Sequence, residues 1–181
     1  MEQTGCAETQ YALVGRPSSV MLDVRALANL TLERARVRRI DLTNMAINKI
    51  VYFVHSDYLV EQGKPLVGAK IEAWLHGPVF RELYQEFKRW GDAPILGKAT
   101  KVDPFSGEVV EAIEIFTAEE RQYIERLIDR YIGFTAARLR AISHTEGGPW
   151  YQVWAHDGRL NPGMKISNEL ILAYHSPGVK Q

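Results

Sequence analysis

The sequence predicts a mainly α-helical, compact domain of about six to seven helices with one small β-hairpin. Apolar residues recur at intervals of three and four through most of the 181-residue chain, which is the spacing of amphipathic helices. Glycine and proline separate these stretches, and one later segment instead combines apolar runs with turn residues. The composition, 46% hydrophobic and 24% charged, is that of an ordinary globular protein with one sizeable core.

The two ends of the chain are set apart from this domain. Residues 1–19 are polar and irregular, so we expect a flexible arm there. Residues 176–181 are expected to form a C-terminal tail. The domain itself is therefore assigned to residues 20–175.

The first helix is expected from about Val20 to Arg36, with Ser18 or Ser19 as its N-cap. Four arginines cluster at its C-terminal end: Arg34, Arg36, Arg38 and Arg39. The cluster is either a small phosphate-binding patch or a solvated helix end whose cations complement the helix dipole. The second interpretation is favoured because it requires no ligand.

A longer second helix is expected over residues 42–62, capped by Asp41 or Thr43. Its apolar residues cover a wide face, which predicts a central place in the core. Gly63 supplies a left-handed end, and Pro65 prevents the helix from continuing.

The next segment is expected to approach a third helix. Residues 70–75 fit a short strand or an extended connection. Gly77 and Pro78 then place a proline in the first turn of a helix, where its missing N–H costs nothing. This helix is expected to continue to Trp90 and to end at Gly91.

Residues 98–116 carry the pattern of a β-hairpin on the edge of the helical body. The turn residues 103–107 lie between two runs rich in valine and isoleucine. Thr117 and Glu120 follow with the spacing of a capping box, which predicts a helix directly after the hairpin. Three shorter helices are expected after it, from Thr135 to His144, from Pro149 to His156, and from Ser167 to His175.

Composition and charge limit the functional classes. The chain has 22 basic and 22 acidic residues, so it lacks the basic excess of a typical nucleic-acid binder. Cys6 is the single cysteine, and it cannot form an internal disulfide. No signal peptide and no apolar run long enough to span a bilayer are visible. We therefore expect a cytoplasmic protein with no membrane partner.

The usual signatures of enzymes and metal sites are missing. The five histidines do not form an HExxH motif and no cysteine pair accompanies them: His55, His76, His144, His156 and His175. No G-x-S-x-G elbow and no glycine-rich phosphate loop occurs. The sequence therefore predicts no catalytic residues, no metal and no cofactor. A hydrolase that uses His76 or His144 stays open as a third alternative, and it would require a metal or an acidic partner at the imidazole.

Two short segments combine aromatic residues with tight backbone bends, at residues 74–79 and 143–150. Their tryptophans are either core residues whose N–H groups meet carbonyls or parts of a partner-binding surface, where tryptophan is enriched. We take as partner-binding candidates the residues that mark both segments: Trp74, His76, Gly77, Pro78, His144 and Trp150.

Four blocks along the chain resemble one family. Residues 42–53 (LTNMAINKIVYF) are similar to a family helix with a K-L-x-Y-F core, and residues 71–79 (IEAWLHGPV) are similar to the signature IEAW-x-x-GPV. Residues 63–66 and 139–150 continue the similarity, the latter with a reordered Thr-His pair. Over roughly residues 22–174 the chain resembles the Panacea domain family, the SocA-like antitoxins of bacterial and phage toxin–antitoxin pairs.

The resemblance implies a non-enzymatic antitoxin that binds and neutralises a protein toxin encoded by a neighbouring gene. In the SocA-like mode it implies a proteolytic adaptor, which delivers the toxin to an ATP-dependent AAA+ protease such as ClpXP. The main alternative is a helix-turn-helix-like DNA-binding regulator or phage accessory protein. Residues 34–39 are the one candidate basic segment for it, so a nucleic-acid partner is not expected.

Overall fold

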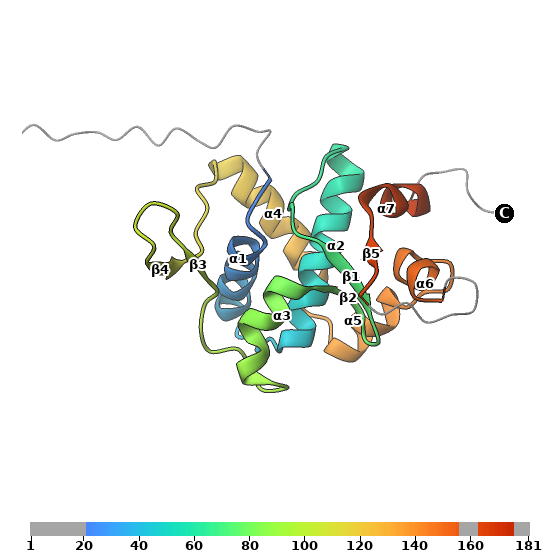
Figure 1. Ribbon diagram of the computed structural model, residues 1–181, viewed down its shortest axis with the longest axis horizontal. Helices are drawn as coiled ribbons and strands as arrows, with labels where there is room; N and C mark the ends of the chain where they lie inside the picture. Colours follow the sequence, from blue (N-terminus) through green and yellow to red (C-terminus); the bar gives the residue numbers. More distant parts are fainter. Residues whose placement is uncertain (1–20, 156–162, 176–181) are drawn as a thin grey trace, which may run out of the picture.

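The computed structural model describes residues 21–155 and 163–175 (Figure 1). The expected arm at 1–19, the tail at 176–181 and His156 lie outside these residues. The described part contains seven α-helices, one short 3-10 helix, a three-stranded antiparallel sheet and a separate two-stranded hairpin. The prediction of a mainly α-helical fold with a small hairpin is confirmed, and the three-stranded sheet is an addition to it.

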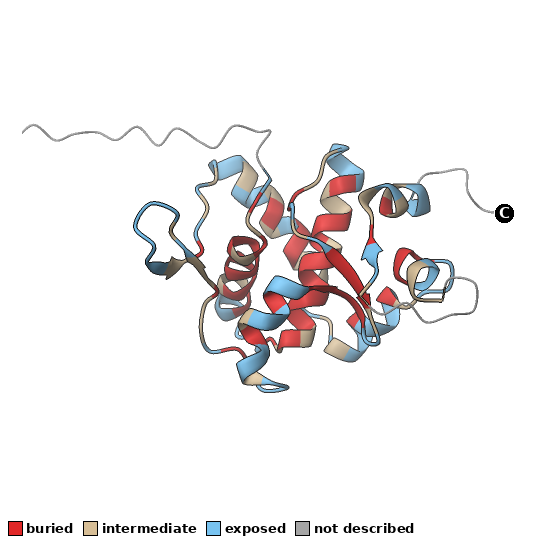
Figure 2. Ribbon diagram, in the orientation of Figure 1, coloured by how far each residue is buried: buried red, intermediate tan, exposed pale blue. Residues whose placement is uncertain are grey.

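Helix α2 (Asn44–Gln62) lies at the centre of the core, as predicted. Figure 2 shows it surrounded by buried segments of the other elements. The Thr43 side chain accepts a hydrogen bond from the Ala46 N–H, and Gly63 ends the helix with φ 66°. The surrounding helices are α1 (Val24–Val37), α3 (Arg81–Phe87), α4 (Ala118–Tyr131), α5 (Ala136–Ser143), α6 (Pro149–Trp154) and α7 (Asn168–His175).

Helix α1 begins at Val24, so the predicted start at Val20 was wrong. Its N-cap is Asp23, whose side chain accepts a hydrogen bond from the Arg25 N–H at 2.9 Å. The preceding residue, Leu22, is extended and forms a parallel bridge to Val67. This pairing with a distant segment is why the helix starts four residues later than its apolar pattern indicates.

A small sheet replaces the predicted start of the third helix. Strands β1 (Ile71–Trp74), β2 (Gly77–Phe80) and β5 (Lys165–Ile166) are antiparallel, in the order β2-β1-β5. The prediction that Gly77 and Pro78 open a helix was wrong, because Pro78 lies opposite Ala73 on an edge strand, where proline is tolerated. Helix α3 starts only at Arg81 and is followed by the 3-10 helix η1 (Lys88–Trp90).

The open edge of β2 is covered by polar side chains of α2. The Phe80 N–H donates to Asn48 Oδ1 at 3.1 Å, and Lys49 Nζ donates to the Pro78 carbonyl at 2.9 Å. Both side chains are buried. The strand therefore takes its hydrogen bonds from β1 on one side and from the central helix on the other.

The predicted hairpin is confirmed as strands β3 (Thr100–Val102) and β4 (Val109–Glu111). It projects from the helical body beside α1 (Figure 1). Asn29 of α1 is buried and binds the base of the hairpin through three hydrogen bonds. Its Oδ1 accepts from the Ala99 N–H, and its Nδ2 donates to the carbonyls of Ala99 and Ala112. A single side chain thus replaces the backbone pairing that the hairpin lacks toward the core.

The later helices follow their predicted caps. Thr117 and Glu120 form the expected capping box at the start of α4. Ser167 accepts a hydrogen bond from the Leu170 N–H at the start of α7. Pro149 occupies the first turn of α6, as predicted. Among the described residues, no helix has both the length and the apolarity that crossing a membrane requires.

Candidate partner-binding pocket

The two aromatic segments singled out in the sequence lie against each other. The indole N–H of Trp150 donates to the Trp74 carbonyl at 2.8 Å. His144 Nε2 lies 3.3 Å from the Leu75 carbonyl oxygen, and its ring centroid lies 3.7 Å from that of Trp150. The turn between β1 and β2 is therefore held against the end of α5 and the start of α6.

Three of the six candidate residues are buried and serve this packing. Trp150 is only 6% exposed, and its N–H meets a backbone carbonyl, which is the core interpretation of this residue. Gly77 has φ 105°, and a Cβ on it would lie 2.6 Å from Ser143 Oγ and 2.7 Å from Lys49 Cε. Pro78 is buried in β2 beside it. These residues position the turn and are not themselves on the surface.

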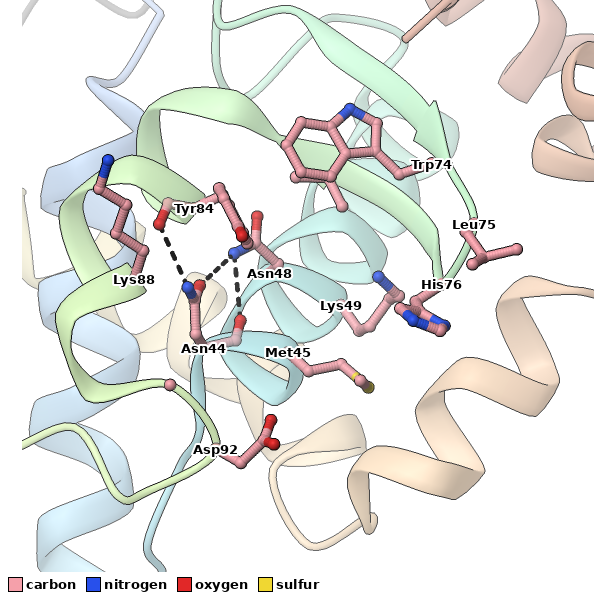
Figure 3. Close-up of a pocket in the computed structure, with 12 residues that line it drawn as sticks. Asn44, Met45, Asn48, Lys49, Trp74, Leu75, His76, Tyr84, Lys88 and Asp92 are labelled. Carbon is pink, nitrogen blue, oxygen red and sulfur yellow. Dashed lines mark hydrogen bonds between the residues drawn. The ribbon is translucent and has the colours of Figure 1, made fainter. Parts of the chain in front are cut away.

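The remaining candidates are accessible. His76 is exposed, whereas Trp74 and His144 are half-buried. Trp74 and His76 line a pocket with a volume of about 290 Å³. Most of its lining is apolar, and its walls come from α2, the β1–β2 turn, α3 and the loop after η1. Figure 3 shows labelled side chains from these elements around the same hollow.

An aromatic pair forms one wall of the pocket. The rings of Trp74 and Tyr84 meet edge to face, with centroids 4.8 Å apart. The Trp74 N–H donates to Glu72 Oε2 at 2.9 Å, which turns the apolar part of the indole toward Tyr84. Tyr84 is 38% exposed and Leu75 is 60% exposed, so apolar surface continues from the pocket to its rim.

Glu72 is a buried carboxylate with a structural role behind this wall. It accepts from Trp74 and forms ion pairs with Lys70 and Arg81. Burial alone would raise its pKa, but the three hydrogen bonds hold the pKa of Glu72 below its ordinary value. The carboxylate therefore stays ionised and fixes the orientation of Trp74.

Two asparagines of α2 form the polar end of the pocket. Asn48 donates to the Asn44 side chain at 2.9 Å, and Asn44 donates to the Tyr84 carbonyl at 3.2 Å (Figure 3). This chain of hydrogen bonds connects α2 to α3. It fixes the distance between the two helices that face each other across the pocket.

Lys49 reaches from α2 toward the β1–β2 turn and contributes to the lining (Figure 3). Its side chain is 1% exposed, and within the described residues its one hydrogen bond goes to the Pro78 carbonyl. No carboxylate in that part of the chain forms an ion pair with it. Burial, with a smaller contribution from the positive charge of Arg140, lowers the pKa of Lys49 to about 7.

A second hollow adjoins the pocket along α5. It is lined by Met45, Ala137, Arg140, Ala141 and His144, and Met45 is shared with the first pocket. The two hollows together carry cations at Lys49, Lys88 and Arg140. In the described lining of the first pocket Asp92 is the one acid. The combined surface is thus apolar with an excess of positive charge.

Lys49, Asn44 and Asn48 were not among the candidates from the sequence. The sequence does show them as polar residues on a helix whose apolar face is unusually wide. Asn44 and Asn48 are four positions apart, so they lie on the same face of this helix, and Lys49 follows directly. Polar side chains on a buried helix require buried partners. The identity of those partners, in β2 and α3, depended on the fold.

The histidines do not gather into a metal site in the part of the chain that the structure describes. No three histidine, cysteine or acidic side chains gather there in a way that could hold a metal ion. The His144 ring contacts the carbonyls of Arg140 and Leu75 and the Ser143 hydroxyl, but no acidic side chain of residues 21–155 or 163–175. His55 is buried and binds Asn168 and the Val67 N–H.

The arginine cluster at the C-terminal end of α1 is largely engaged within the chain. Arg34 and Arg38 both form ion pairs with Asp129 of α4, each at 2.6 Å. Arg36 donates to the Leu96 carbonyl at 3.2 Å. Their charge is thus partly neutralised by α4, which argues against a recognition surface for phosphates.

Comparison with known proteins places the chain in a family. The family described as "Antitoxin SocA-like, Panacea domain" matches residues 47–151, which include the pocket residues from Asn48 to Asp92 and both aromatic segments. Antitoxin SocA of Caulobacter vibrioides (strain NA1000 / CB15N) is 36% identical over 156 residues, which cover 86% of this chain and 82% of that protein. No solved structure shows a significant match. The chain therefore belongs to the SocA-like Panacea domain family of antitoxins.

Proposed function

We propose that this chain is a cytoplasmic antitoxin that binds and neutralises a protein toxin encoded by a neighbouring gene, and that it catalyses no reaction. The observation that carries the proposal is the 36% identity to Antitoxin SocA, which extends over 82% of that protein. An antitoxin role requires a surface for another protein and no reacting groups.

The pocket beside Trp74 offers such a surface. Its rim exposes Leu75 and Tyr84, and Trp74 is half-buried beside them. Large apolar side chains around a hollow with a few polar groups are typical of the regions that contribute most to protein–protein affinity. His76 lines this pocket, and His144 Nε2 lies 3.3 Å from the Leu75 carbonyl oxygen, so the accessible candidate residues all lie at or beside the β1–β2 turn.

Binding can neutralise the toxin in two ways. The antitoxin either covers the active surface of the toxin directly, or it acts as an adaptor and presents the toxin to an AAA+ protease such as ClpXP. The two modes make different demands on the chain, because an adaptor requires a second surface for the protease. Cells that lack the protease distinguish the two modes. Neutralisation by direct covering persists in such cells, whereas neutralisation by protease delivery does not.

A DNA-binding regulator is the competing function. It would depend on the arginines at the C-terminal end of α1, of which Arg34 and Arg38 are paired with Asp129. A phosphate-binding segment loses affinity steeply as salt is added. Retention on DNA that falls with salt, and that is abolished when these arginines are replaced by glutamine, would support the regulator in place of the antitoxin.

Titration of the purified neighbouring gene product into this protein tests the proposal directly. We expect saturable heat in calorimetry and a change in intrinsic tryptophan fluorescence, because Trp74 lines the candidate surface. The Tyr84→Ala variant is expected to bind more weakly, whereas Val60→Ala, an exposed apolar position elsewhere on α2, is expected to bind like the wild type. Absence of any binding by the wild-type chain would contradict the proposal.

A further inference from the structure

Lys49 carries more hydrogen-bonding capacity than the fold uses. An ammonium group has three N–H donors, and within the described residues one of them is used, by the Pro78 carbonyl. Covering one carbonyl on a strand edge requires only one donor, which a neutral glutamine also supplies. The charge and the two further donors therefore have no structural partner in that part of the chain.

The charge is also placed where it is costly. Lys49 is 1% exposed, and a buried ammonium is disfavoured unless an anion accompanies it. Arg140 adds a second positive charge in its vicinity, and the repulsion between the two charges lowers the pKa of Lys49 further. The surroundings thus favour the approach of an anion over the approach of a neutral group.

The shape of the pocket limits what can bring this anion. The lining is mostly apolar, and the aromatic pair Trp74 and Tyr84 lies on one side of the lysine. Asp92 is the one acid among the described lining residues. A volume of about 290 Å³ accommodates one or two side chains, and not a folded element. The occupant is therefore a short apolar group that carries a negative charge.

We infer that this pocket receives a carboxylate of the toxin, next to an apolar or aromatic side chain, and that Lys49 forms a buried ion pair with it. The inference rests on the proposed function, since it names the part of the toxin that the antitoxin recognises. The carboxylate comes either from an Asp or Glu side chain or from the C-terminus of the toxin. In both cases the apolar neighbour packs against Trp74 and Tyr84.

The neighbouring hollow extends the same pattern. Arg140 lines it and Met45 connects it to the pocket, so a second acidic residue of the toxin would meet Arg140 beside the first. This arrangement predicts that attraction between opposite charges raises the association rate with the toxin and also stabilises the buried contact. Removal of Arg140 is expected to have a smaller effect than removal of Lys49, because Arg140 is exposed.

The test measures binding of the neighbouring gene product to four forms of the full chain: wild type, Lys49→Met, Lys49→Gln and a control, Lys165→Met. Lys165 is an exposed lysine on β5, at the opposite edge of the sheet from β2. We expect both Lys49 variants to lose at least about 10-fold in affinity, since a buried charge pair loses one partner. Lys165→Met is expected to bind as the wild type does. Circular dichroism and thermal melting establish that each variant is folded.

Changes in the toxin distinguish the two sources of the carboxylate. In one series each Asp or Glu of the toxin is replaced by Asn or Gln, and in another the C-terminus is extended by Gly-Ser. One of these changes is expected to weaken binding to the wild-type chain and to have no further effect on binding to Lys49→Met. If a Lys49 variant folds poorly, the cycle is lost, but the toxin-side changes stay informative because they are measured against the wild-type chain.

The outcomes separate this inference from the proposed function. If the wild-type chain does not bind the neighbouring product, the proposed function itself is contradicted. If the wild-type chain binds, and neither the Lys49 variants nor any carboxylate change in the toxin reduces affinity, the antitoxin role stands and the carboxylate pocket is wrong. Loss of affinity in both the Lys49 variants and one toxin variant, without additivity, is the result that we expect.

Discussion

The indole N–H of Trp150 donates to the backbone carbonyl of Trp74 at 2.8 Å. These residues are 76 positions apart, and each lies in one of the two aromatic segments that stand out in the sequence. The bond connects the start of α6 with the end of β1, directly behind the pocket. The geometry of the candidate surface therefore depends on the packing of the C-terminal helices.

Replacement of Trp150 by phenylalanine tests this dependence. The change removes the hydrogen bond and part of a side chain that is 6% exposed, so we expect the free energy of unfolding to fall by about 2 kcal/mol. Urea denaturation gives this value. The control is Tyr151→Phe, whose side chain is 39% exposed on the same helix and whose loss is expected to stay within about 0.5 kcal/mol. Equal stability of Trp150→Phe and the control would contradict the structural role.

Gly77 is expected to tolerate no side chain. Gly77→Ala would place a Cβ within 2.6 Å of Ser143 Oγ and 2.7 Å of Lys49 Cε, at φ 105°. We expect a loss of about 2–4 kcal/mol in the free energy of unfolding, from backbone strain plus overpacking. Gly107→Ala is the matched control, because it has φ 74° with no atom within 4 Å and should lose only about 1 kcal/mol. A similar loss in both variants would show that packing against α2 and α5 is unimportant.

Lys49 is expected to lower the stability of the free protein. Its pKa is about 7 in the folded chain and 10.5 for an ordinary lysine, so the unfolded chain binds more protons between these pH values. The contribution of Lys49 to stability therefore rises with pH from about 7 to 10.5. Lys49→Met lacks this rise and is expected to be more stable than the wild type at pH 7, by about 1–2 kcal/mol.

Denaturation of both proteins at pH 7 and at pH 9 measures this difference. The advantage of Lys49→Met should be smaller at pH 9, where the wild-type lysine is neutral in the folded state. The same variant is expected to bind the toxin less well, so stability and binding change in opposite directions. A destabilised Lys49→Met at both pH values would mean that the lysine is mainly a structural cap for the Pro78 carbonyl.

His55 makes the fold sensitive to acid. Its ring is 1% exposed, accepts from the Val67 N–H and contacts Asn168, and burial lowers its pKa below the ordinary 6.5. Below pH 6.5 the unfolded chain therefore binds a proton that the folded chain excludes, and stability falls as the pH drops toward the folded pKa. We expect a smaller decrease between pH 7 and pH 5.5 in His55→Gln than in the wild type.

Urea titrations at the two pH values check this expectation. His76→Gln is the control, because His76 is exposed and its removal leaves the buried histidine in place. The control should keep the full pH dependence of the wild type. An unchanged dependence in His55→Gln would assign the acid sensitivity to other groups.

Asn29 is expected to hold the β3–β4 hairpin on the helical body. It makes three hydrogen bonds to backbone groups of Ala99 and Ala112 and is 3% exposed, so Asn29→Ala leaves these groups without that partner. We expect a loss of about 2–4 kcal/mol and faster hydrogen exchange at the Ala99 amide. Ser106→Ala, in the exposed turn of the same hairpin, should change neither quantity. Unchanged exchange at Ala99 in Asn29→Ala would contradict the anchor.

Local signals in the sequence were sufficient for most helix ends. Thr43, Thr117 and Ser167 cap their helices through side-chain hydrogen bonds over three residues, and Gly63 ends α2 in the left-handed conformation. Such contacts depend only on neighbours in the chain. The central place of α2 also followed from its own pattern, because a wide apolar face requires partners on several sides.

The errors occurred where distant segments decide the structure. The local sequence at Pro78 predicts the start of a helix, but β2 forms because β1 pairs with it and because Asn48 and Lys49 cover its outer edge. Helix α1 starts at Val24 and not at Val20 because Leu22 bridges to Val67. The pocket was anticipated only through Trp74 and its neighbours, since the burial of a lysine without an acidic partner is a property of the fold.

Growth of bacteria that express the neighbouring gene, with and without this chain, is the decisive measurement of its antitoxin role. We expect that the neighbouring product stops growth and that coexpression of this chain restores it, with Lys49→Met rescuing less well than Lys165→Met. Repetition in cells without ClpX or ClpP separates direct blocking, which persists, from protease delivery, which does not. A harmless neighbouring product, or one that stays lethal while this chain is expressed and soluble, would contradict the antitoxin account.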